Sequence, residues 1–256
     1  MEKWLSLWSI GQEADLKAFR QIKDAGFVGV EIWAEHVCAD DYLEFARQCD
    51  LRIGLHLPFH DMNLATPDDS VRDRMLEVNQ QWLEKLAEYG GEHAVIHGGQ
   101  AWSSEEREAA LENVRHRLLK LREIAEANHV TLLLENLIPD KLNYGHIVAS
   151  TVAEWCGLLK GTDIQACLDT GHLAVMGDSL PETINLLGER LASVHYSAND
   201  AVADLHLIPE NHAELLAALR EIDYQGPIVY ELNPYKYSLK DILESTSVQE
   251  LLQMEI

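Results

Sequence analysis

Four ionisable residues each follow a short apolar run in the second half of the chain: Glu135, Asp169, His195 and Glu231. Each run is too short for a helix and is typical of a buried strand. The intervals between the four residues are 34, 26 and 36 positions, each close to the length of one strand and one helix. Parallel strands of a barrel point their carboxyl ends to one face, so we expect these side chains to converge.

Three carboxylates and an imidazole in one small volume predict a divalent-metal site. Carboxylates packed closely raise each other's pKa unless a cation lies between them. Oxygen ligands with one neutral imidazole suit Mn, Zn, Co or Mg. A single carboxylate or histidine after a strand is more often a helix N-cap or a solvated loop residue. Four in consecutive repeats favour the metal.

Further candidate ligands follow other predicted strands: His56, His97, His172, Asp204 and His206. Each alone is more often a hydrogen-bonded structural or substrate-facing residue. Asp204 and His206 alternate along the chain, so an extended loop would place both on one side. Together these residues could hold a second or third metal ion, which gives one to three ions in all. Alternatively, His172 and His206 could orient the carboxylates of the first site and bind substrate hydroxyls.

The elements that must position these residues alternate regularly along the chain. Strands are predicted at residues 3–9, 28–33, 52–57, 93–97, 131–135, 164–169, 191–197 and 227–232. Helices are predicted at residues 13–25, 40–49, 69–89, 103–128, 151–159, 181–190, 211–222 and 239–254. Eight strand–helix units with apolar strands predict an α/β fold, a (β/α)8 TIM barrel, with one domain over residues 1–256. A doubly wound open sheet is the rival, but no Gly-x-Gly-x-x-Gly turn follows the first strand.

Composition narrows the class of partner. The chain has 256 residues and 47% hydrophobic content, enough for one sizeable core. Its net charge of −23 repels polyanions, so nucleic acid and anionic membranes are not expected as partners. No signal peptide and no apolar run long enough to span a membrane is visible, so we expect a cytoplasmic protein. The four cysteines form no Cys-x-x-Cys pair, which favours reduced thiols.

Four segments resemble the motifs of the xylose isomerase-like barrels, a superfamily that includes sugar phosphate isomerase/epimerase-like proteins and endonuclease IV. The segments are Leu132–Asn136, Cys167–His172, His195–Asp200 and Asp204–Pro209. The resemblance extends over most of the chain. In the ketose epimerase and inosose isomerase branches, the residues that match Glu135, Asp169, His195 and Glu231 bind one divalent metal. There the two glutamates also exchange protons with the substrate.

The resemblance extends to the trinuclear zinc site of the endonuclease IV branch. The residues with counterparts among its ligands are His56, His97, Glu135, Asp169, His172, His195, Asp204, His206 and Glu231. Two features depart from that branch: the strong negative charge, and the lack of the Arg- or aromatic-rich insertions that a DNA-bending enzyme needs. Uncharacterised sugar isomerase-like proteins keep much of this histidine set, so ligand number does not settle the substrate.

The first functional hypothesis is a metal-dependent isomerase or epimerase of a small sugar, polyol-type or sugar-derived hydroxy-ketone substrate. Glu135 and Glu231 would remove and return a proton through a metal-stabilised enediolate, and His172 would steady the oxyanion. A hydride shift between two metals is another route to the same product. The alternatives are an endonuclease IV-like zinc phosphodiesterase and a non-catalytic metal- or sugar-binding barrel.

Other residues near the strand ends have two interpretations each. The aromatic residues Trp8, Trp33, Phe59 and Trp102 either form the walls of a sugar site or pack in the core. Glu31 is expected to point into the barrel and to pair with a Lys or His, and His93 is interpreted as a surface or packing residue. Barrels of this kind often pair through their helices, which allows a homo-oligomer.

Overall fold

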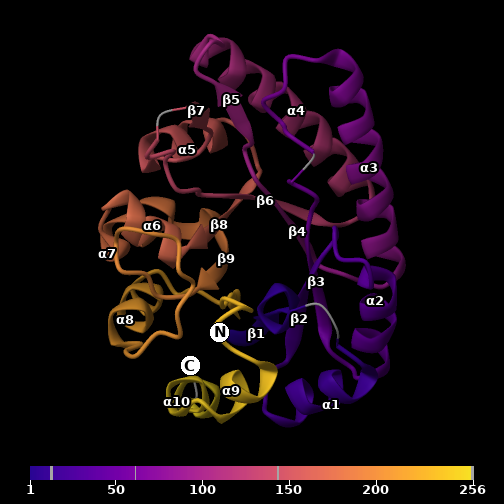
Figure 1. The fold of residues 1–256 in the computed structure, drawn as a ribbon, viewed down its shortest axis with the longest axis vertical. Coiled ribbons are helices and arrows are strands. Elements are labelled where there is room, and N and C mark those ends of the chain that lie inside the picture. The colour runs from indigo at the N-terminus through magenta and orange to yellow at the C-terminus, as the bar shows by residue number, and fades with distance from the viewer. Residues whose placement is uncertain (12–13, 61, 143, 255–256) are drawn as a thin grey trace.

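The computed structural model describes residues 1–11, 14–60, 62–142 and 144–254 (Figure 1). Eight parallel strands form a closed barrel in the order β1-β10-β9-β8-β6-β4-β3-β2, so the predicted TIM barrel is confirmed. The barrel strands are β1 (Glu2–Ser6), β2 (Gly29–Trp33), β3 (Arg52–His56), β4 (His93–Ile96), β6 (Thr131–Glu135), β8 (Gln165–Asp169), β9 (Leu191–Tyr196) and β10 (Pro227–Tyr230). β1 pairs with both β2 and β10, which closes the barrel.

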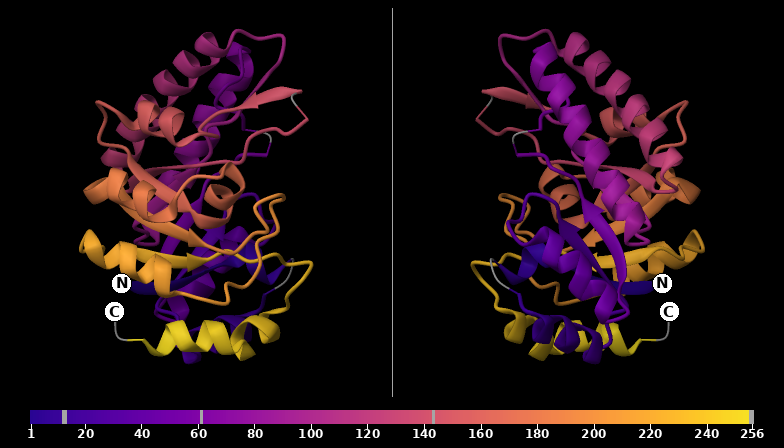
Figure 2. Two further views of the ribbon diagram at one scale, coloured as in Figure 1. Left: turned by 90° about the vertical axis from the view of Figure 1, so that its left-hand side faces the viewer. Right: turned by 90° about the vertical axis from the view of Figure 1, so that its right-hand side faces the viewer.

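Helices surround the barrel on its outside (Figures 1 and 2). They are α1 (Leu16–Asp24), α2 (Ala39–Gln48), α3 (Asp69–Glu88), α4 (Arg107–Ala127), α5 (Val152–Leu159), α7 (Leu180–Leu187), α8 (Ala213–Glu221), α9 (Leu239–Glu244) and α10 (Thr246–Gln253). Several begin at a side-chain cap: the Asp68 carboxylate, for example, accepts hydrogen bonds from the first amides of α3. No helix in the described ranges has the length and apolar character needed to cross a membrane.

The core lies mainly between the strands and the helices. Trp155 of α5 is fully buried there, and its Nε1 donates a hydrogen bond to the Leu134 carbonyl of β6 at 2.9 Å. A smaller apolar cluster of Val95, Leu133 and Cys167 is separate from this main core. Its members come from β4, β6 and β8, and Cys167 stands two positions before Asp169 at the end of β8.

Some predicted element boundaries are wrong. The first strand was expected to reach residue 9, but it ends at Ser6 and a 3-10 helix, η1 (Leu7–Ile10), follows. Ser9 donates to the Tyr230 carbonyl and accepts from the Leu232 amide, which draws the chain toward the end of β10. The last predicted helix is divided at Ser245, whose extended backbone separates α9 from α10. The predicted first helix begins at residue 13, outside the described residues, and α1 starts at Leu16.

An antiparallel ribbon and a short helix were not predicted. The two-stranded ribbon, formed by β5 (Gln100–Trp102) and β7 (Gly145–Ile147), lies outside the barrel. The short helix, α6 (Thr170–Met176), begins immediately after β8. The helix predicted at residues 181–190 ends as α7 at Leu187, and its last three residues form a 3-10 turn, η2 (Gly188–Arg190), before β9. Helix α6 matters for the site because it carries His172 in its first turn.

Candidate metal centre

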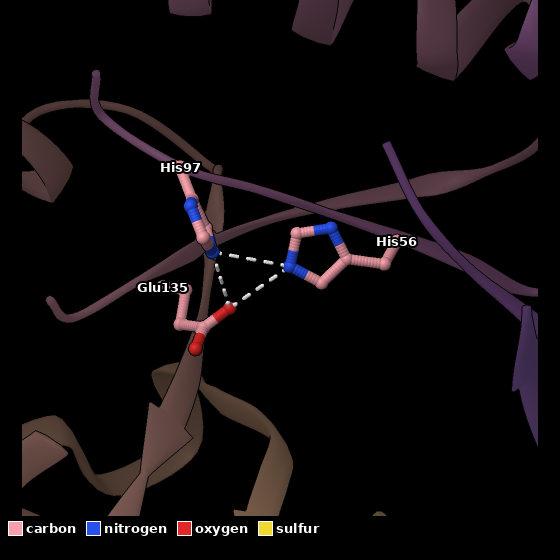
Figure 3. A group of neighbouring side chains, drawn as sticks. All are labelled: His56, His97 and Glu135. Carbon is pink, nitrogen blue, oxygen red and sulfur yellow. Dashed lines mark hydrogen bonds and ion pairs between the residues drawn. The ribbon is translucent and has the colours of Figure 1, made fainter. Parts of the chain in front are cut away.

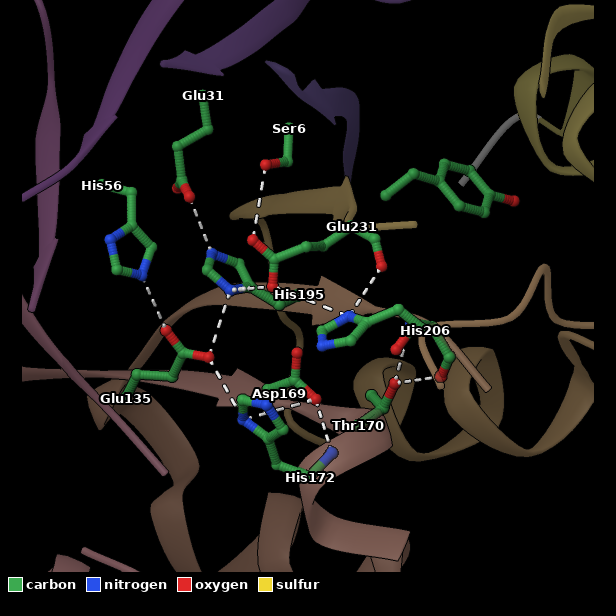
Figure 4. Close-up of polar contacts among 12 residues, drawn as sticks. Ser6, Glu31, His56, Glu135, Asp169, Thr170, His172, His195, His206 and Glu231 are labelled. Carbon is green, nitrogen blue, oxygen red and sulfur yellow. Dashed lines mark hydrogen bonds and ion pairs between the residues drawn. The ribbon is translucent and has the colours of Figure 1, made fainter. Parts of the chain in front are cut away.

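The four strand-end residues that opened the sequence analysis meet inside the mouth of the barrel (Figure 4). One ligand atom from each of Glu135, Asp169, His195 and Glu231 lies within 4.8 Å of the others, and all four residues are buried. We call these residues the central cluster. The first three belong to β6, β8 and β9, and Glu231 immediately follows β10. These four strands are adjacent in the barrel, and Asp169 is directly opposite His195 in the sheet register.

Within the central cluster, His195 contacts both glutamates. Its Nδ1 lies 3.2 Å from Glu231 Oε2 and 3.4 Å from Glu135 Oε1. Besides belonging to the central cluster, Asp169 is the N-cap of α6. Its Oδ1 accepts a hydrogen bond from the His172 amide at 2.6 Å. Its other oxygen, Oδ2, has no hydrogen-bond partner in the described part of the chain although it is buried.

A second group of side chains shares Glu135 with the central cluster (Figure 3). We call His56, His97 and Glu135 the His56 cluster. Both histidines bring Nε2 to 3.3 Å from Glu135 Oε2, and the two Nε2 atoms lie 3.1 Å apart. The two oxygens of Glu135 therefore face different groups of imidazoles, as they would in a carboxylate that bridges two ions.

A third group shares Asp169 with the central cluster. We call Asp169, His172 and His206 the His206 cluster, and one ligand atom from each lies within 4.8 Å of the others. Asp204 joins the two histidines: its Oδ2 lies 3.3 Å from His172 Nε2, and its Oδ1 lies 3.0 Å from His206 Nε2. The loop that carries Asp204 and His206 is held by Asn199, whose Oδ1 accepts the His206 amide at 2.9 Å.

Three of the imidazoles are oriented in the same way. His56, His172 and His206 each place Nδ1 2.8–3.0 Å from a backbone carbonyl oxygen. A carbonyl only accepts, so each Nδ1 carries a proton, and in the neutral form of the ring Nε2 has the lone pair. All three Nε2 atoms face the clusters, which is the arrangement that a metal-binding histidine requires.

The donor set fits divalent ions. The three clusters offer carboxylates and imidazoles, they share Glu135 and Asp169, and the buried Asp169 Oδ2 and His195 Nδ1 lack hydrogen-bond partners among the described residues. A buried polar atom without a partner is costly, and a bound cation would satisfy both atoms. The ligands that each ion would use are therefore those of the three clusters, with Asp204 added to the His206 cluster.

The electrostatics of the site show which protons an ion must displace. Burial favours the neutral acid, but His195 and His97 outweigh it and hold the pKa of Glu135 well below its usual range. For Asp169 burial dominates and raises the pKa to about 6. Burial opposes the charge of His206, yet its contact with Asp204 raises the pKa of the imidazole to about 9. Metal binding at these clusters would therefore be coupled to proton release.

A cavity of about 320 Å³ opens above the clusters and is lined in part by Glu135, Glu231 and His172. Its aromatic walls include three of the four residues predicted for this purpose, Trp8, Trp33 and Phe59, together with Tyr235. Trp102 does not line this cavity. It lies on the ribbon strand β5 and is 62% exposed, so it neither forms a wall of the cavity nor packs in the core.

A second cavity of about 490 Å³ adjoins the first and shares His97, His172 and Asp204 with it. It extends toward Gln100 and Ile147 of the β5–β7 ribbon. None of the described residues that line either cavity is a lysine or an arginine. A group bound in them would meet aromatic rings, amides and the clusters, but no protein cation of that kind.

Two supporting residues were missed or underrated from the sequence. His93, interpreted as a surface or packing residue, is buried, and its Nε2 lies 3.1 Å from Glu31 Oε2. Ser6 had no assigned role, and its hydroxyl donates to Glu231 Oε1 at 3.3 Å. Glu31 points into the barrel and pairs with histidines, as expected. The sequence did contain a signal that His93 is buried, because it is a polar residue in an otherwise apolar predicted strand.

Comparison with known proteins identifies the family. Residues 19–251 match the family model described as the xylose isomerase-like TIM barrel. The chain belongs to this family. The xylose isomerase-like relatives include the uncharacterized protein MJ1311 of Methanocaldococcus jannaschii, which is 28% identical over 218 residues and covers 80% of this chain and 71% of the relative. Endonuclease 4 of Thermus thermophilus is 31% identical over 145 residues, 52% of this chain and 48% of that protein.

Solved structures share the xylose isomerase-like fold. A D-tagatose 3-epimerase-like protein superposes with a TM-score of 0.85 at 23% identity, covering 98% of this chain and 97% of the other. D-psicose 3-epimerase from Clostridium cellulolyticum H10 superposes with a TM-score of 0.78 at 19% identity, covering 98% of this chain and 97% of the other. At these identities the likeness shows the fold alone.

Proposed function

We propose that the protein is a divalent-metal-dependent isomerase or epimerase of a sugar or a sugar-derived hydroxy-ketone. One observation carries the proposal. Glu135 at the end of β6 and Glu231 just after β10 line the same cavity. Both lie within 3.4 Å of His195 Nδ1, at the buried centre of a donor set suited to a divalent ion. Two carboxylates so arranged can remove a proton from a carbon and return one to it.

The residues of the central cluster would hold the ion. When bound, a divalent ion would polarise a carbonyl and an adjacent hydroxyl and so acidify the C–H bond between them. Glu231 is positioned for proton transfer by the Ser6 hydroxyl at 3.3 Å and by His195 at 3.2 Å. Burial of Glu231 favours its neutral acid, but His195 outweighs this effect and holds the pKa of Glu231 below its usual value. The side chain is therefore ionised at neutral pH and can accept a proton.

His172 would act on the oxygen of the substrate. It lines the cavity, and its Nε2 faces Asp204 at 3.3 Å. In the charged form, favoured because Asp169 and Asp204 outweigh the effect of burial and raise its pKa, the imidazole can donate to an oxygen that gains negative charge. The two glutamates would then move the proton while His172 steadies the oxygen.

The walls of the cavity favour an uncharged, sugar-sized substrate. Ligand sites of this kind have volumes of roughly 300–1,000 Å³, and the cavity of about 320 Å³ is at the lower end. Trp8, Trp33 and Phe59 offer flat apolar faces to the C–H side of a sugar ring. The similar solved structures include D-psicose 3-epimerase with D-tagatose, which supports ketohexoses as the first substrates to test.

Exchange of substrate protons with heavy water tests this function. Metal-free protein is loaded with Mn²⁺, Co²⁺, Zn²⁺ or Mg²⁺ and incubated with a panel of ketoses, and deuterium at the carbon beside the carbonyl is measured by NMR. We expect exchange that chelators abolish and that Glu231→Gln slows by about 100-fold or more. The exposed Glu182 of α7 provides the matched control, Glu182→Gln, with wild-type rates. Conversion of a ketose without exchange would indicate a hydride shift, and sugar binding with neither conversion nor exchange would indicate a non-catalytic sugar-binding barrel.

A specific observation favours a second candidate, a multinuclear zinc phosphodiesterase. The three clusters share Glu135 and Asp169, so up to three ions could lie side by side, and part of the chain is similar to endonuclease 4. The net charge of −23 and the cavities without lysine or arginine among their described residues oppose a polyanionic substrate. Cleavage of a duplex with an abasic site by zinc-loaded protein, weakened steeply by salt, would support this candidate over the first.

A further inference from the structure

A buried polar group lies beyond the central cluster, in the barrel interior. Glu31 of β2 and His195 of β9 are both fully buried, and His93 of β4 is 6% exposed. Glu31 Oε1 lies 2.9 Å from His195 Nε2, as a close ion-pair contact rather than an aligned hydrogen bond, and Glu31 Oε2 lies 3.1 Å from His93 Nε2 (Figure 4 shows Glu31 and His195). Glu31 lines neither cavity, so it does not meet the substrate.

A glycine makes this arrangement possible. In the sheet register Glu31 is opposite Gly54 of β3, and Gly54 is opposite His93 of β4. A Cβ atom on Gly54 would lie 2.5 Å from His93 Nε2, so the ring occupies the space that a side chain would take. Trp4 packs against His93, with ring centroids 5.3 Å apart. His93 therefore reaches across β3 to Glu31.

The contact with Glu31 determines which nitrogen of His195 faces the central cluster. A neutral imidazole carries one N–H and one lone pair. A proton on Nε2, the nitrogen that lies 2.9 Å from Glu31, leaves the lone pair on Nδ1, which lies 3.2 Å from Glu231 and 3.4 Å from Glu135. This is the reverse of His56, His172 and His206, whose Nδ1 atoms face carbonyls and whose Nε2 atoms face the clusters.

Filling this space with a buried carboxylate costs more free energy than filling it with an apolar side chain. Moving a charge out of water is costly unless it is paired, and an apolar side chain would pack without that cost. Both Glu31 oxygens contact imidazole nitrogens. The pattern matches the general arrangement in which a carboxylate fixes the tautomer and orientation of a metal-binding histidine.

We propose that Glu31, held by His93 across the gap at Gly54, is a positioning residue that makes Nδ1 the metal-binding atom of His195. The inference rests on the proposed metal centre and goes beyond it, because it assigns a role to residues that touch neither the ion nor the substrate. Glu31 orients His195 and strengthens its hold on the ion, and His93 and Gly54 keep Glu31 in place.

Zinc affinity tests the proposal without any substrate. Wild-type protein, Glu31→Gln and the control Glu182→Gln, at an exposed glutamate of α7, are stripped of metal and titrated with Zn²⁺ against a chromophoric chelator. We expect Glu31→Gln to weaken the binding of at least one zinc ion by about 10–100-fold, and Glu182→Gln to bind zinc as the wild type does. The melting temperatures of the metal-free proteins are measured alongside, so that a loss of folding is distinguished from a loss of zinc affinity.

Two outcomes distinguish a failure of the role of Glu31 from a failure of the proposed metal centre. Glu31→Gln that binds every zinc ion as tightly as the wild type overturns the role of Glu31 and leaves the metal centre standing. Wild-type protein that binds no zinc overturns both.

A second measurement uses the unaltered zinc-loaded protein and so does not depend on the folding of a variant. In the ¹⁵N NMR spectrum of the His195 ring, we expect a protonated Nε2 and a zinc-bound Nδ1. A protonated Nδ1 contradicts the proposal, and a merely structural role for Glu31 would not require either pattern.

Discussion

Acidification is expected to release metal from the centre in two stages, because the protein's own protons compete for the ligand atoms. Asp169, shared by two clusters, has a pKa raised to about 6 by burial. His206 has a pKa raised to about 9 by Asp204, which outweighs its burial. An ion that binds to either group must displace its proton. The affinity for metal therefore rises as the pH passes the pKa of that group.

The two pKa values set the size of the effect. About one pH unit below the pKa of Asp169, protonation alone weakens binding to its carboxylate roughly tenfold, or about 1.4 kcal/mol. At about pH 7 His206 is almost fully charged in the metal-free site, because its pKa is about 9. An ion that uses His206 should therefore bind roughly 100-fold more weakly there than above pH 9. The ion of the central cluster uses Asp169 but not His206. It must also displace a proton from His195, whose pKa Cys167 and Glu231 raise well above its usual value despite burial, so its affinity should follow a different pH profile.

Titration calorimetry with Zn²⁺ at about pH 5, 6, 7, 8 and 9 measures both stages. Buffers of different ionisation enthalpy give the number of protons released with each ion, since the observed heat includes their uptake by the buffer. We expect net proton release at every pH in this range and two different pH profiles. Zinc affinity that does not change between about pH 5 and pH 9 would refute this account of the electrostatics.

Three further predictions concern stability and binding. The metal-free protein should lose about 3 kcal/mol of its free energy of unfolding between pH 6.5 and pH 9. The folded-state pKa of His206 lies above its unfolded value, so the stability that charged His206 contributes is full below pH 6.5 and disappears as pH rises through about 9. Urea unfolding that shows constant or rising stability over this range contradicts the prediction. Gly54→Ala should cost about 1–3 kcal/mol, because its Cβ would meet His93 at 2.5 Å, and wild-type urea stability would disprove the crowding. On the proposed function, Trp33→Ala should raise KM for the sugar more than it lowers kcat, because Trp33 forms a cavity wall; steady-state kinetics with an equal loss in both would place the residue in the chemical step.

The barrel was predictable because local signals and the global fold agree. Short apolar runs alternate with amphipathic segments of about one helix length, and each strand of the closed barrel falls within a predicted range or one residue from it. The convergence of Glu135, Asp169, His195 and Glu231 follows from the fold, since parallel barrel strands end at one face.

Elements that depend on distant partners were not predictable. The strand at the N-terminus stops at Ser6 because Ser9 hydrogen-bonds to Tyr230 and Leu232, more than 200 positions away. The β5–β7 ribbon pairs two segments of three residues each, too short for a periodic signal. Helix α6 follows β8 without a loop, because the Asp169 side chain caps it directly.

The supporting residues of the site depend on sheet register, which the sequence does not state. Glu31, Gly54 and His93 lie side by side only because three strands pair in one particular register. From the sequence, Gly54 is an unremarked glycine and His93 is one histidine among several. The strand-end ligands are visible from sequence because fold topology alone brings them together.

The metal content of the protein tests the central claim most directly. Wild-type protein and Glu135→Gln are purified without added metal and examined by elemental analysis, before and after incubation with Mn²⁺, Co²⁺, Zn²⁺ and Mg²⁺. We predict one to three divalent ions per wild-type chain and fewer in the variant, because Glu135 belongs to the central cluster and to the His56 cluster. Wild-type protein that retains no divalent ion, or a variant that retains as much as the wild type, would contradict the claim that these clusters form a metal centre.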